Sequence, residues 1–361
     1  MKTIKIAFDI SPLSDGNKTR GMGYYTKNLL EYLQKEIKSN PKYKNWQIDL
    51  ITNSNQALSN YHLVHYPYFD LFKLTLPIKK NIPQIVTVPD LIPLQFKKHY
   101  PVGLRGFITW QIQKYKIKKS DYLITISNYS KTIINKYLNI PNDNIFVTHL
   151  AANSNFRPIT NKNKLMRIKN KYKLPSEFVL YVGDINWNKN IPNLVKACIK
   201  LKYPLVIVGS AATNHQIINH PWNQDLIWLQ QITKKHSNLI TLTGFTDDKE
   251  IPSIYNLAKI YCQPSYSEGF GLPLVEAMQT GTPVVYSQES CLNEIMNNSG
   301  LMFDPYSIEK IAESLKRMWT YKKLRDKYSK LGIHRAKFFN WQNTAKDTLA
   351  IYEKAILNDQ K

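Results

Sequence analysis

The sequence predicts an α/β protein with two doubly wound parallel sheets, and three observations lead to this fold class. The chain has 361 residues, which exceeds what one ordinary core organises, so two domains are expected. Short apolar runs alternate with helical stretches from end to end, a pattern typical of parallel α/β units. The alternation restarts near residues 178–185, after a polar and basic stretch at 153–177 that contains Pro158 and is typical of a linker.

The individual elements are expected in the following chain order. In the first half, strands are expected at 4–10, 84–92 and 122–127, followed by helices at 23–37, 104–119 and 128–138. Another strand is expected to end at His65. In the second half, strands are expected at 178–185, 204–210, 238–245, 259–265 and 282–287, with a helix at 190–201 among them. Residues 341–357 carry apolar side chains at helical spacing and are predicted to form a last helix.

The net charge of +23 calls for an explanation, and nucleic acid is the first partner that a basic chain brings to mind. The excess is carried by 42 Lys against 7 Arg, whereas nucleic-acid readers use Arg for bidentate contacts. No RNA- or DNA-binding signature accompanies the charge. Nucleic acid is therefore disfavoured as a partner, and an anionic membrane surface stays open as a second interpretation.

The first residues, the lengths of the apolar runs and the cysteines indicate the cellular compartment. The first residues, MKTIKIAFDI, lack the apolar region and cleavage site of a secretory signal, and no apolar run approaches the ~18 residues of a spanning helix. Cys198, Cys262 and Cys291 are odd in number and far apart, which disfavours a disulfide framework. These features predict a cytoplasmic protein.

Two carboxylates, Glu268 and Glu276, flank a glycine turn. A strand at 259–265 precedes the turn, Pro273 suits a first helical turn, and Gly281 suits the position just past a helix end. On one continuous helix the two acids would lie about 12 Å apart along the axis, so they could not share a site. With a turn between them, both can face the carboxyl end of the strand, where open α/β sheets bind ligands.

The helix after this turn offers unpaired N–H groups to an anion such as a diphosphate. A carboxylate would repel a phosphate, so we expect the two acids to accept hydrogen bonds from sugar hydroxyls instead. The alternative is that Glu268 only caps the helix and that Glu276 is a solvated helix residue. Gly269 and Gly271, which bracket Phe270, favour the functional interpretation.

The stretch SEGFGLPLVEAMQTGTPVV resembles the E-x7-E signature of glycosyltransferase family 4, the retaining nucleotide-sugar enzymes with the GT-B fold. Other segments extend the resemblance over nearly the whole chain: RGMGYYTKNLL, VHYPYF, VTVPDLIPL, SDYLITISNYSKTII, YVGDINWNKNIPNLVKA, LTGFTDDKEIPSIYNLA and FFNWQNTAKDTLAIY. The resemblance specifies the family but neither the donor nor the acceptor.

The resemblance implies a division of roles within the E-x7-E stretch. Glu276 is expected to bind the ribose hydroxyls of the donor, and Glu268 is expected to face the sugar at the reacting centre. The turn itself, which includes Gly269, is expected to hold the sugar and the distal phosphate through the backbone N–H groups of Phe270, Gly271 and Leu272.

Lys189 is the expected cation for the departing diphosphate, because it follows a strand and lies at the same sheet edge as the glycine turn. Asn188, its neighbour, is expected to contact the donor. A surface lysine is the alternative if the residue is considered alone. Many family members carry Arg directly after the glycine of this segment, whereas this chain has Asp184, which leaves Lys189 as the main cationic contact.

The amino-terminal half supplies further candidates. Gly21 and Gly23 precede a helix and permit close backbone approach to phosphates or sugar, although the match to the dinucleotide fingerprint is poor and a NAD-type cofactor is disfavoured. Asp90 follows Pro89, where the family often has His; it is expected to bind hydroxyls or, equally, to cap a turn. His65 is expected to contact donor or acceptor, with a buried structural histidine as the alternative.

Three more segments complete the candidate residues. Phe245 and Thr246 are expected near the base pocket, and the two aspartates that follow are expected to start a helix rather than to bind a metal. Ser127 resembles a residue that lines the cleft in the family, but capping the next helix is the favoured role. No metal and no other cofactor is expected, in keeping with GT-B enzymes in general.

The predicted helix at 104–119 combines apolar residues such as Phe107, Ile108 and Ile112 with a cluster of lysines. A basic amphipathic helix of this kind can lie on an anionic membrane and bring the enzyme to a lipid-linked acceptor. The favoured alternative is an ordinary helix that packs on its own sheet and has a solvated lysine end.

The predicted protein is therefore a GT-B enzyme with two Rossmann-like domains that face each other across a cleft. Residues 1–160 are expected to form the acceptor domain, on which the terminal helix 341–361 packs, and residues 161–340 the nucleotide-sugar domain. The expected reaction transfers a hexose, such as mannose or glucose, with retention to a hydroxyl of a glycan or polyprenyl-linked acceptor in cell-surface polysaccharide or glycolipid synthesis. A sugar-nucleotide epimerase and a non-catalytic glycan- or membrane-binding protein are the alternatives.

Overall fold

The computed structural model describes residues 3–14, 21–52, 58–77, 79–213 and 217–359. The chain forms two compact units. The first contains residues 1–95, 101–150 and 340–361, and the second contains residues 96–100 and 151–339. The main crossover between the units therefore follows Leu150, about ten residues earlier than the sequence pattern predicts.

The first unit is built on a six-stranded parallel sheet with the strand order β2-β1-β3-β4-β5-β6. Its strands are β1 (Ile4–Asp9), β2 (Trp46–Ile51), β3 (Leu63–Tyr66), β4 (Gln84–Thr87), β5 (Tyr122–Thr125) and β6 (Ile145–Val147). Every residue of β3, β4 and β5 is buried, because helices cover both faces of a parallel sheet. The helices are α1 (Gly21–Ser39), α2 (Ile92–Gln95), α3 (Leu104–Ile117), α4 (Asn128–Leu138) and α13 (Trp341–Asp359).

The second unit has a six-stranded parallel sheet with the order β9-β8-β7-β10-β11-β12. Its strands are β7 (Val179–Val182), β8 (Leu205–Val208), β9 (Ile240–Gly244), β10 (Ile260–Gln263), β11 (Val284–Ser287) and β12 (Leu301–Phe303). The strand order reverses between β7 and β10, which is the point where doubly wound sheets bind ligands.

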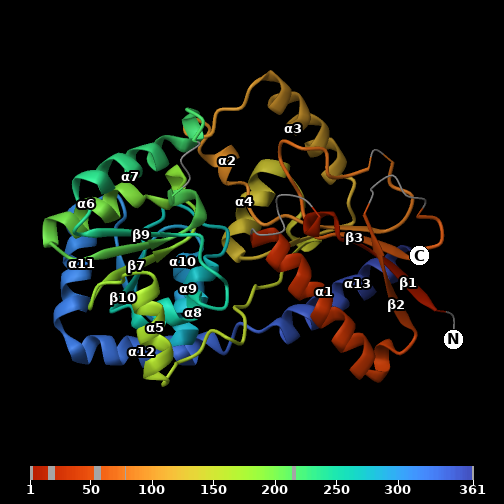
Figure 1. The fold of residues 1–361 in the computed structure, drawn as a ribbon. Helices are drawn as coiled ribbons and strands as arrows, with labels where there is room; N and C mark the ends of the chain where they lie inside the picture. The colour runs from red at the N-terminus through yellow and green to blue at the C-terminus, as the bar shows by residue number, and fades with distance from the viewer. Residues whose placement is uncertain (1–2, 15–20, 53–57, 78, 214–216, 360–361) are drawn as a thin grey trace. The chain divides into compact units, whose positions relative to one another are not determined.

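Eight α-helices flank this second sheet in the described residues (Figure 1). They are α5 (Lys162–Lys171), α6 (Ile191–Leu201), α7 (Gln224–Lys235), α8 (Ile251–Leu257), α9 (Leu272–Thr280), α10 (Leu292–Met296), α11 (Ile308–Thr320) and α12 (Lys322–Ala336). Helix α6 packs on α11, and α9 packs on both α8 and α12. The core lies between these helices and the sheet, with side chains such as Leu194, Val206 and Leu315 fully buried.

The last helix belongs to the first unit although it is distant in sequence. Helix α13 packs along α1, and the two run side by side in Figure 1. The Thr344 hydroxyl donates to the His149 carbonyl at 2.6 Å, and Tyr352 is fully buried. The chain therefore crosses back after residue 339 to complete the core of its first unit.

The α/β doubly wound fold class is confirmed, but three strands escaped the sequence pattern. Strand β2 is partly exposed along its length and lies at a sheet edge, so it lacks the continuous apolar run of a buried parallel strand. Strands β6 and β12 have only three residues each and are also at edges. A run that short gives no readable periodicity.

Candidate active site

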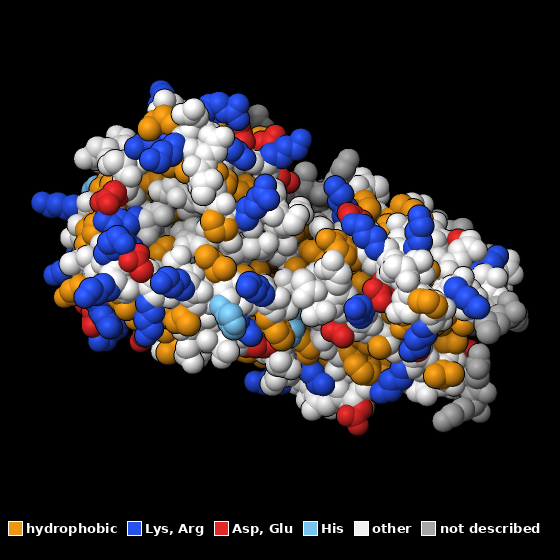
Figure 2. Space-filling view, turned by 90° about the horizontal axis from the view of Figure 1, so that it is seen from below, with side chains coloured by type: hydrophobic (Ala, Val, Ile, Leu, Met, Phe, Trp, Pro, Cys, Tyr) orange, Lys and Arg blue, Asp and Glu red, His pale blue; other side chains and the backbone are white. Residues whose placement is uncertain are grey.

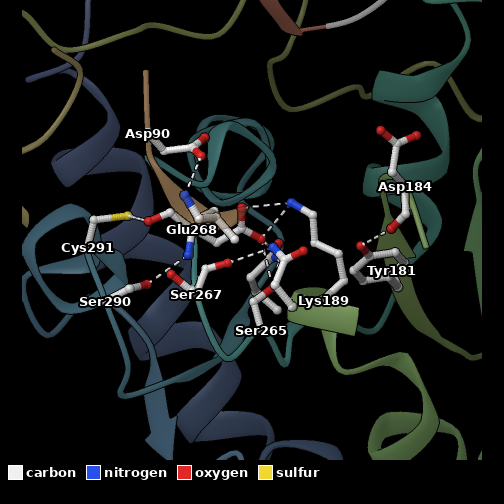
Figure 3. Close-up of polar contacts among 12 residues, drawn as sticks. Asp90, Tyr181, Asp184, Lys189, Ser265, Ser267, Glu268, Ser290 and Cys291 are labelled. Carbon is white, nitrogen blue, oxygen red and sulfur yellow. Dashed lines mark hydrogen bonds and ion pairs between the residues drawn. The ribbon is translucent and has the colours of Figure 1, made fainter. Parts of the chain in front are cut away.

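Lys189 and Glu268 meet at the point where the strand order of the second sheet reverses. Lys189 ends the 3₁₀ turn η4 (Trp187–Lys189) after β7, and Glu268 lies in the loop after β10. The Lys189 Nζ atom is 2.9 Å from Oε1 and 2.7 Å from Oε2 of Glu268 (Figure 3). Parallel neighbouring strands end at the same edge of a sheet, which explains why residues 79 positions apart form an ion pair.

The Glu268 carboxylate is almost completely buried, with 6% of the residue exposed, and two further side chains fix it. Its Oε1 atom accepts from Gln263 Nε2 at 2.8 Å and from the Ser265 hydroxyl at 2.7 Å. The backbone N–H of Glu268 donates to Ser290 Oγ at 3.0 Å, and the Cys291 thiol donates to its carbonyl at 3.2 Å. The charge is therefore compensated, as a buried carboxylate requires.

The glycine turn requires its glycine at position 271. Gly271 has φ +84°, and a Cβ atom there would lie 3.0 Å from the Leu292 side chain. Helix α9 starts directly after it, with Pro273 in the first turn, and Gly281 (φ +77°) ends the helix as predicted. The N-cap residue of α9 is Gly271, which has no side chain to cap the helix, and it ends the same loop that carries Glu268.

Glu276 lies one turn inside α9 and has surroundings of its own. The Tyr255 hydroxyl donates to its Oε2 atom at 2.8 Å. Burial raises the pKa of Glu276 to about 7, an effect that the Tyr255 hydrogen bond opposes and nearby Asp248 reinforces. The two acids of the E-x7-E stretch thus differ: Glu268 is paired with a cation, whereas Glu276 is a desolvated carboxyl that titrates near neutrality.

Asn190 connects the loops of this site and was missed by sequence reasoning. Its backbone is left-handed (φ +56°), and its Nδ2 atom donates to the carbonyls of Pro264 and Pro305, both at 2.9 Å. The side chain thereby joins the segments after β7, β10 and β12. An Asn directly before an apolar helix was the available signal, because Asn tolerates left-handed geometry.

Asn188, which is expected to contact the donor, has a side chain that is engaged within the protein. The residue is buried, its Nδ2 atom donates to the Ser267 carbonyl at 2.8 Å, and its Oδ1 atom accepts from the Tyr100 hydroxyl. Both polar atoms are therefore used inside the second unit. Asp184 contributes a backbone carbonyl to the Tyr181 hydroxyl at 2.7 Å, and its carboxylate points away from Lys189 in Figure 3.

The predicted base-pocket residues have opposite environments. Phe245 is 78% exposed after β9, whereas Thr246 is buried and its hydroxyl lies 3.1 Å from that of Thr243. Gly269 and Leu272 lie in the glycine turn and at the start of α9, as expected. The Phe270 ring is buried against Phe339.

In the first unit, His65 is a core residue, which matches the buried structural histidine that the sequence left open as the alternative. It has no exposed surface, and its ring nitrogens lie 2.6 Å from the Tyr352 hydroxyl and 2.8 Å from the Thr87 hydroxyl. Burial lowers its pKa to about 3, so the imidazole stays neutral. The residue occupies the middle of β3, where a parallel strand buries every side chain.

The remaining candidates of the first unit lie at helix starts. Asp90 Oδ1 accepts from the Ile92 backbone N–H at 3.0 Å, which is the turn-capping role that the sequence left open. Ser127 caps α4 by accepting from Ser130 N–H at 3.0 Å, so that expectation is confirmed. Gly21 and Gly23 belong to the first turn of α1, and the loop that precedes them lies outside the described residues.

Neither a cluster of metal-ligating side chains nor a membrane-spanning helix occurs in the described part of the chain. No three His, Cys, Asp or Glu side chains gather there to hold a metal ion. None of the helices in the described ranges is long and apolar enough to cross a bilayer.

Known proteins are similar to this chain in sequence and in fold. Residues 162–335 match the family model "Glycosyl transferases group 1". The O-antigen chain mannosyltransferase B of Escherichia coli is 29% identical over 238 residues, which are 64% of this chain and 60% of that protein. The MMP alpha-(1->4)-mannosyltransferase of Mycolicibacterium hassiacum is 34% identical over 146 residues, 36% of each chain. The chain thus spans less than two thirds of either relative.

Solved structures extend the likeness in fold to nearly the whole chain. Sucrose-phosphate synthase from Thermosynechococcus elongatus has a TM-score of 0.75 at 19% identity and covers 98% of this chain and 100% of its own. HepE from Anabaena, solved with UDP and glucose, has a TM-score of 0.72 at 14% identity and covers 97% and 99%. The chain therefore has the fold of GT-B glycosyltransferases, and its residues 162–335 match glycosyl transferases group 1.

We expect the Lys189–Glu268 pair to be energetically coupled in the folded protein. In a double-mutant cycle with Lys189→Met and Glu268→Gln, the coupling energy should be about 1–3 kcal/mol, because either single change leaves one charge buried without its partner. Unfolding each variant in guanidinium chloride gives the free energies of unfolding from which this coupling energy is calculated. The exposed Lys310–Glu313 pair is the control and should give about 0–1 kcal/mol. Equal coupling energies for the two pairs would contradict the assignment.

Proposed function

We propose that this chain is a retaining glycosyltransferase that transfers mannose from a nucleoside-diphosphate sugar to a hydroxyl of a glycan or lipid-linked acceptor. The observation that carries the proposal is the Lys189–Glu268 pair at the ligand-binding edge of the second sheet, next to the uncapped start of α9. The family match over residues 162–335 and the names of the relatives support it.

The electrostatics of this edge suit a leaving diphosphate. The C–O bond between the anomeric carbon and the diphosphate breaks, and negative charge collects on the phosphate oxygens. Lys189 and the first-turn N–H groups of α9 stabilise that charge, which is the largest that develops in the reaction. The diphosphate then competes with Glu268 for the lysine, so donor binding loosens the ion pair of the ligand-free protein.

Glu268 is suited to hold hydroxyls rather than to attack carbon. Its carboxylate already accepts from Lys189, Ser265 and Gln263, which lowers its nucleophilicity and fixes its orientation. We therefore propose attack by the acceptor hydroxyl on the face that the diphosphate leaves. The new C–O bond forms there, and the hydroxyl proton passes to a phosphate oxygen. No metal is required in this scheme.

Mannose is proposed because several relatives are mannosyltransferases by name, among them the O-antigen chain mannosyltransferase B and the MMP alpha-(1->4)-mannosyltransferase. These names describe the relatives and not this chain. Donor choice in this chain depends on contacts around the base and the hexose. A role in cell-surface polysaccharide synthesis follows from the same likeness and is part of the proposal.

The proposal is tested by nucleoside-diphosphate release from a panel of GDP-mannose, UDP-glucose and UDP-galactose, with and without α-mannoside acceptors. We expect GDP release that an acceptor accelerates, and we expect Lys189→Ala to lower kcat by about 100-fold, the scale of losing one charge-stabilising donor. Lys310→Ala, on the surface of α11, is the control. A new sugar nucleotide without an acceptor would establish an epimerase, and release from no donor would favour a non-catalytic binder.

Donor affinity should depend on pH through Glu276. The pKa of about 7 means that the carboxyl is largely protonated at pH 6, whereas binding two ribose hydroxyls favours the ionised form. Donor affinity should therefore rise about tenfold between pH 6 and 8, and Glu276→Gln should bind more weakly with a flat profile. Calorimetric titration with GDP-mannose measures this, with the exposed Glu313→Gln as control. A rising profile in Glu276→Gln would contradict the role.

A peripheral contact with an anionic membrane is the second part of the proposal. Helix α3 buries Trp110 and Ile117 in the first unit but leaves an apolar stripe on its other side. The exposed fractions are 77% for Leu104, 53% for Phe107 and 50% for Ile108. Positions 104, 108, 112 and 115 follow helical spacing, and Arg105, Lys114, Lys118 and Lys119 flank them.

The apolar stripe on α3 supports contact with a lipid surface more strongly than the overall charge of the protein does. On the face seen in Figure 2, Lys and Arg side chains are spread over both units and mixed with acidic and apolar ones. A spread charge gives only weak attraction, whereas an apolar stripe with flanking cations can enter the headgroup region. One side of α3 packs on the sheet and the other side presents the apolar stripe. The helix therefore combines the packing role and the membrane role that the sequence suggested.

Phe107→Ser with Ile108→Ser should reduce sedimentation with phosphatidylglycerol vesicles by about tenfold, because each change removes apolar area from the lipid-facing stripe. Ile218→Ser, at an exposed residue of the second unit, is the matched control and should bind as the unmodified protein does. Equal binding of the protein to phosphatidylcholine and phosphatidylglycerol vesicles would refute the electrostatic part, and unchanged binding of the double variant would refute the stripe.

A further inference from the structure

A cavity of about 340 Å³ lies in the second unit beside the candidate active site. This volume is at the lower end of the ~300–1,000 Å³ range of small-ligand pockets. One of its walls is Trp187, which belongs to the same 3₁₀ turn as Lys189. The residues that line it are Lys98, His99, Trp187, Pro221, Trp222, Gln224 and Asp225. None of them has a role in the donor site described above.

Aromatic rings hold the walls of this cavity in place. The His99 ring stacks on Trp187 with centroids 3.6 Å apart and an angle of 9° between the planes. Tyr266 contacts Trp187 at 4.9 Å, and Tyr100 meets Trp222 edge-on at 5.2 Å. The indoles are thereby preorganised, which reduces the entropy that a ligand must overcome on binding.

A carboxylate faces this cavity and has capacity left to accept hydrogen bonds. Asp225 lies in the first turn of α7, and no described residue donates a hydrogen bond to its carboxylate. Burial raises the pKa of Asp225, although His99 and Lys196 oppose the rise. A desolvated acceptor of this kind gains most from a ligand that brings hydroxyl or N–H donors.

Aromatic walls together with a carboxylate match the chemistry of a sugar ring. The C–H faces of a pyranose are apolar and pack on indoles, while its vicinal hydroxyls donate to a carboxylate. Asp225 disfavours a phosphate in its own vicinity, and Lys98, which also lines the cavity, can accompany a sugar hydroxyl as a donor. A nucleobase could also stack here, but the base is expected near Phe245 and Thr246 at the end of β9, a different strand.

We infer that this cavity is an acceptor subsite that binds one pyranose ring of a glycan against the Trp222 indole, with Asp225 accepting from its hydroxyls and Trp187, covered by His99 and Tyr266, forming the rigid opposite wall. The inference rests on the proposed function, because it assigns the acceptor class of the same enzyme. It places a sugar of the growing chain beside the turn that carries Lys189, so the cavity selects acceptors that already contain at least two rings.

The test is direct binding of α-linked mannotetraose and cellotetraose, measured by saturation-transfer NMR. For the tetrasaccharide that binds, Asp225→Asn and Trp222→Ala should raise Kd by about tenfold, which corresponds to the loss of one hydrogen-bonded or stacked contact. Trp222→Phe keeps a ring and should retain most of the affinity. Asp326→Asn, on the exposed surface of α12, should not change Kd.

Kinetics separate this inference from the proposed function. In an active protein, Asp225→Asn should raise KM for the tetrasaccharide while KM for the donor changes less than about twofold. One outcome is a protein that binds the tetrasaccharide, with weaker binding in Asp225→Asn, and yet releases no nucleoside diphosphate. That result would support the subsite and contradict the transferase activity. Three results would overturn the subsite: no binding of either tetrasaccharide, equal Kd in Asp225→Asn and the unmodified protein, or displacement of the sugar by GDP alone.

Discussion

The buried carboxylate of Glu268 imposes the main constraint on the second unit. A charge in that position requires a cation and hydrogen-bond donors nearby, and the loop after β7 brings Lys189 while β10 and its loop bring Gln263 and Ser265. These partners can meet only if β7 and β10 are neighbours, as the reversed strand order makes them. The ion pair, the glycine turn and the start of α9 are therefore brought together by the same strand order.

The loops around this carboxylate are held by amide side chains rather than by further charges. Asn190 joins three loops through two carbonyls, and Asn188 joins Tyr100 to Ser267. Neutral amides satisfy buried carbonyls without adding a charge that would disturb a phosphate site. The polar positions around the pair thus divide into residues that position the backbone and residues whose side chains remain available to a ligand.

Several candidates could be predicted from the sequence because their roles depend on local geometry. Gly271, Pro273 and Gly281 mark a turn, a helix start and a helix end, and each occupies that position. Local patterns also placed Lys189 and Glu268 after strands. The same reasoning could not decide the side-chain roles of His65 and Asn188, because a polar side chain near a strand end can face a ligand or bond inside the core, and only the packing decides.

What the sequence determined by itself was the alternation of strands and helices, the division into two units and the turn between two acids. These follow from periodicity and from glycine and proline, which act over a few residues. The tertiary structure decided the strand order, the pairing of Lys189 with Glu268, the neutral core role of His65 and the cavity around Trp187 and Trp222. Each of these joins residues far apart in the chain, and burial and hydrogen-bond geometry at such contacts are set only when the elements pack.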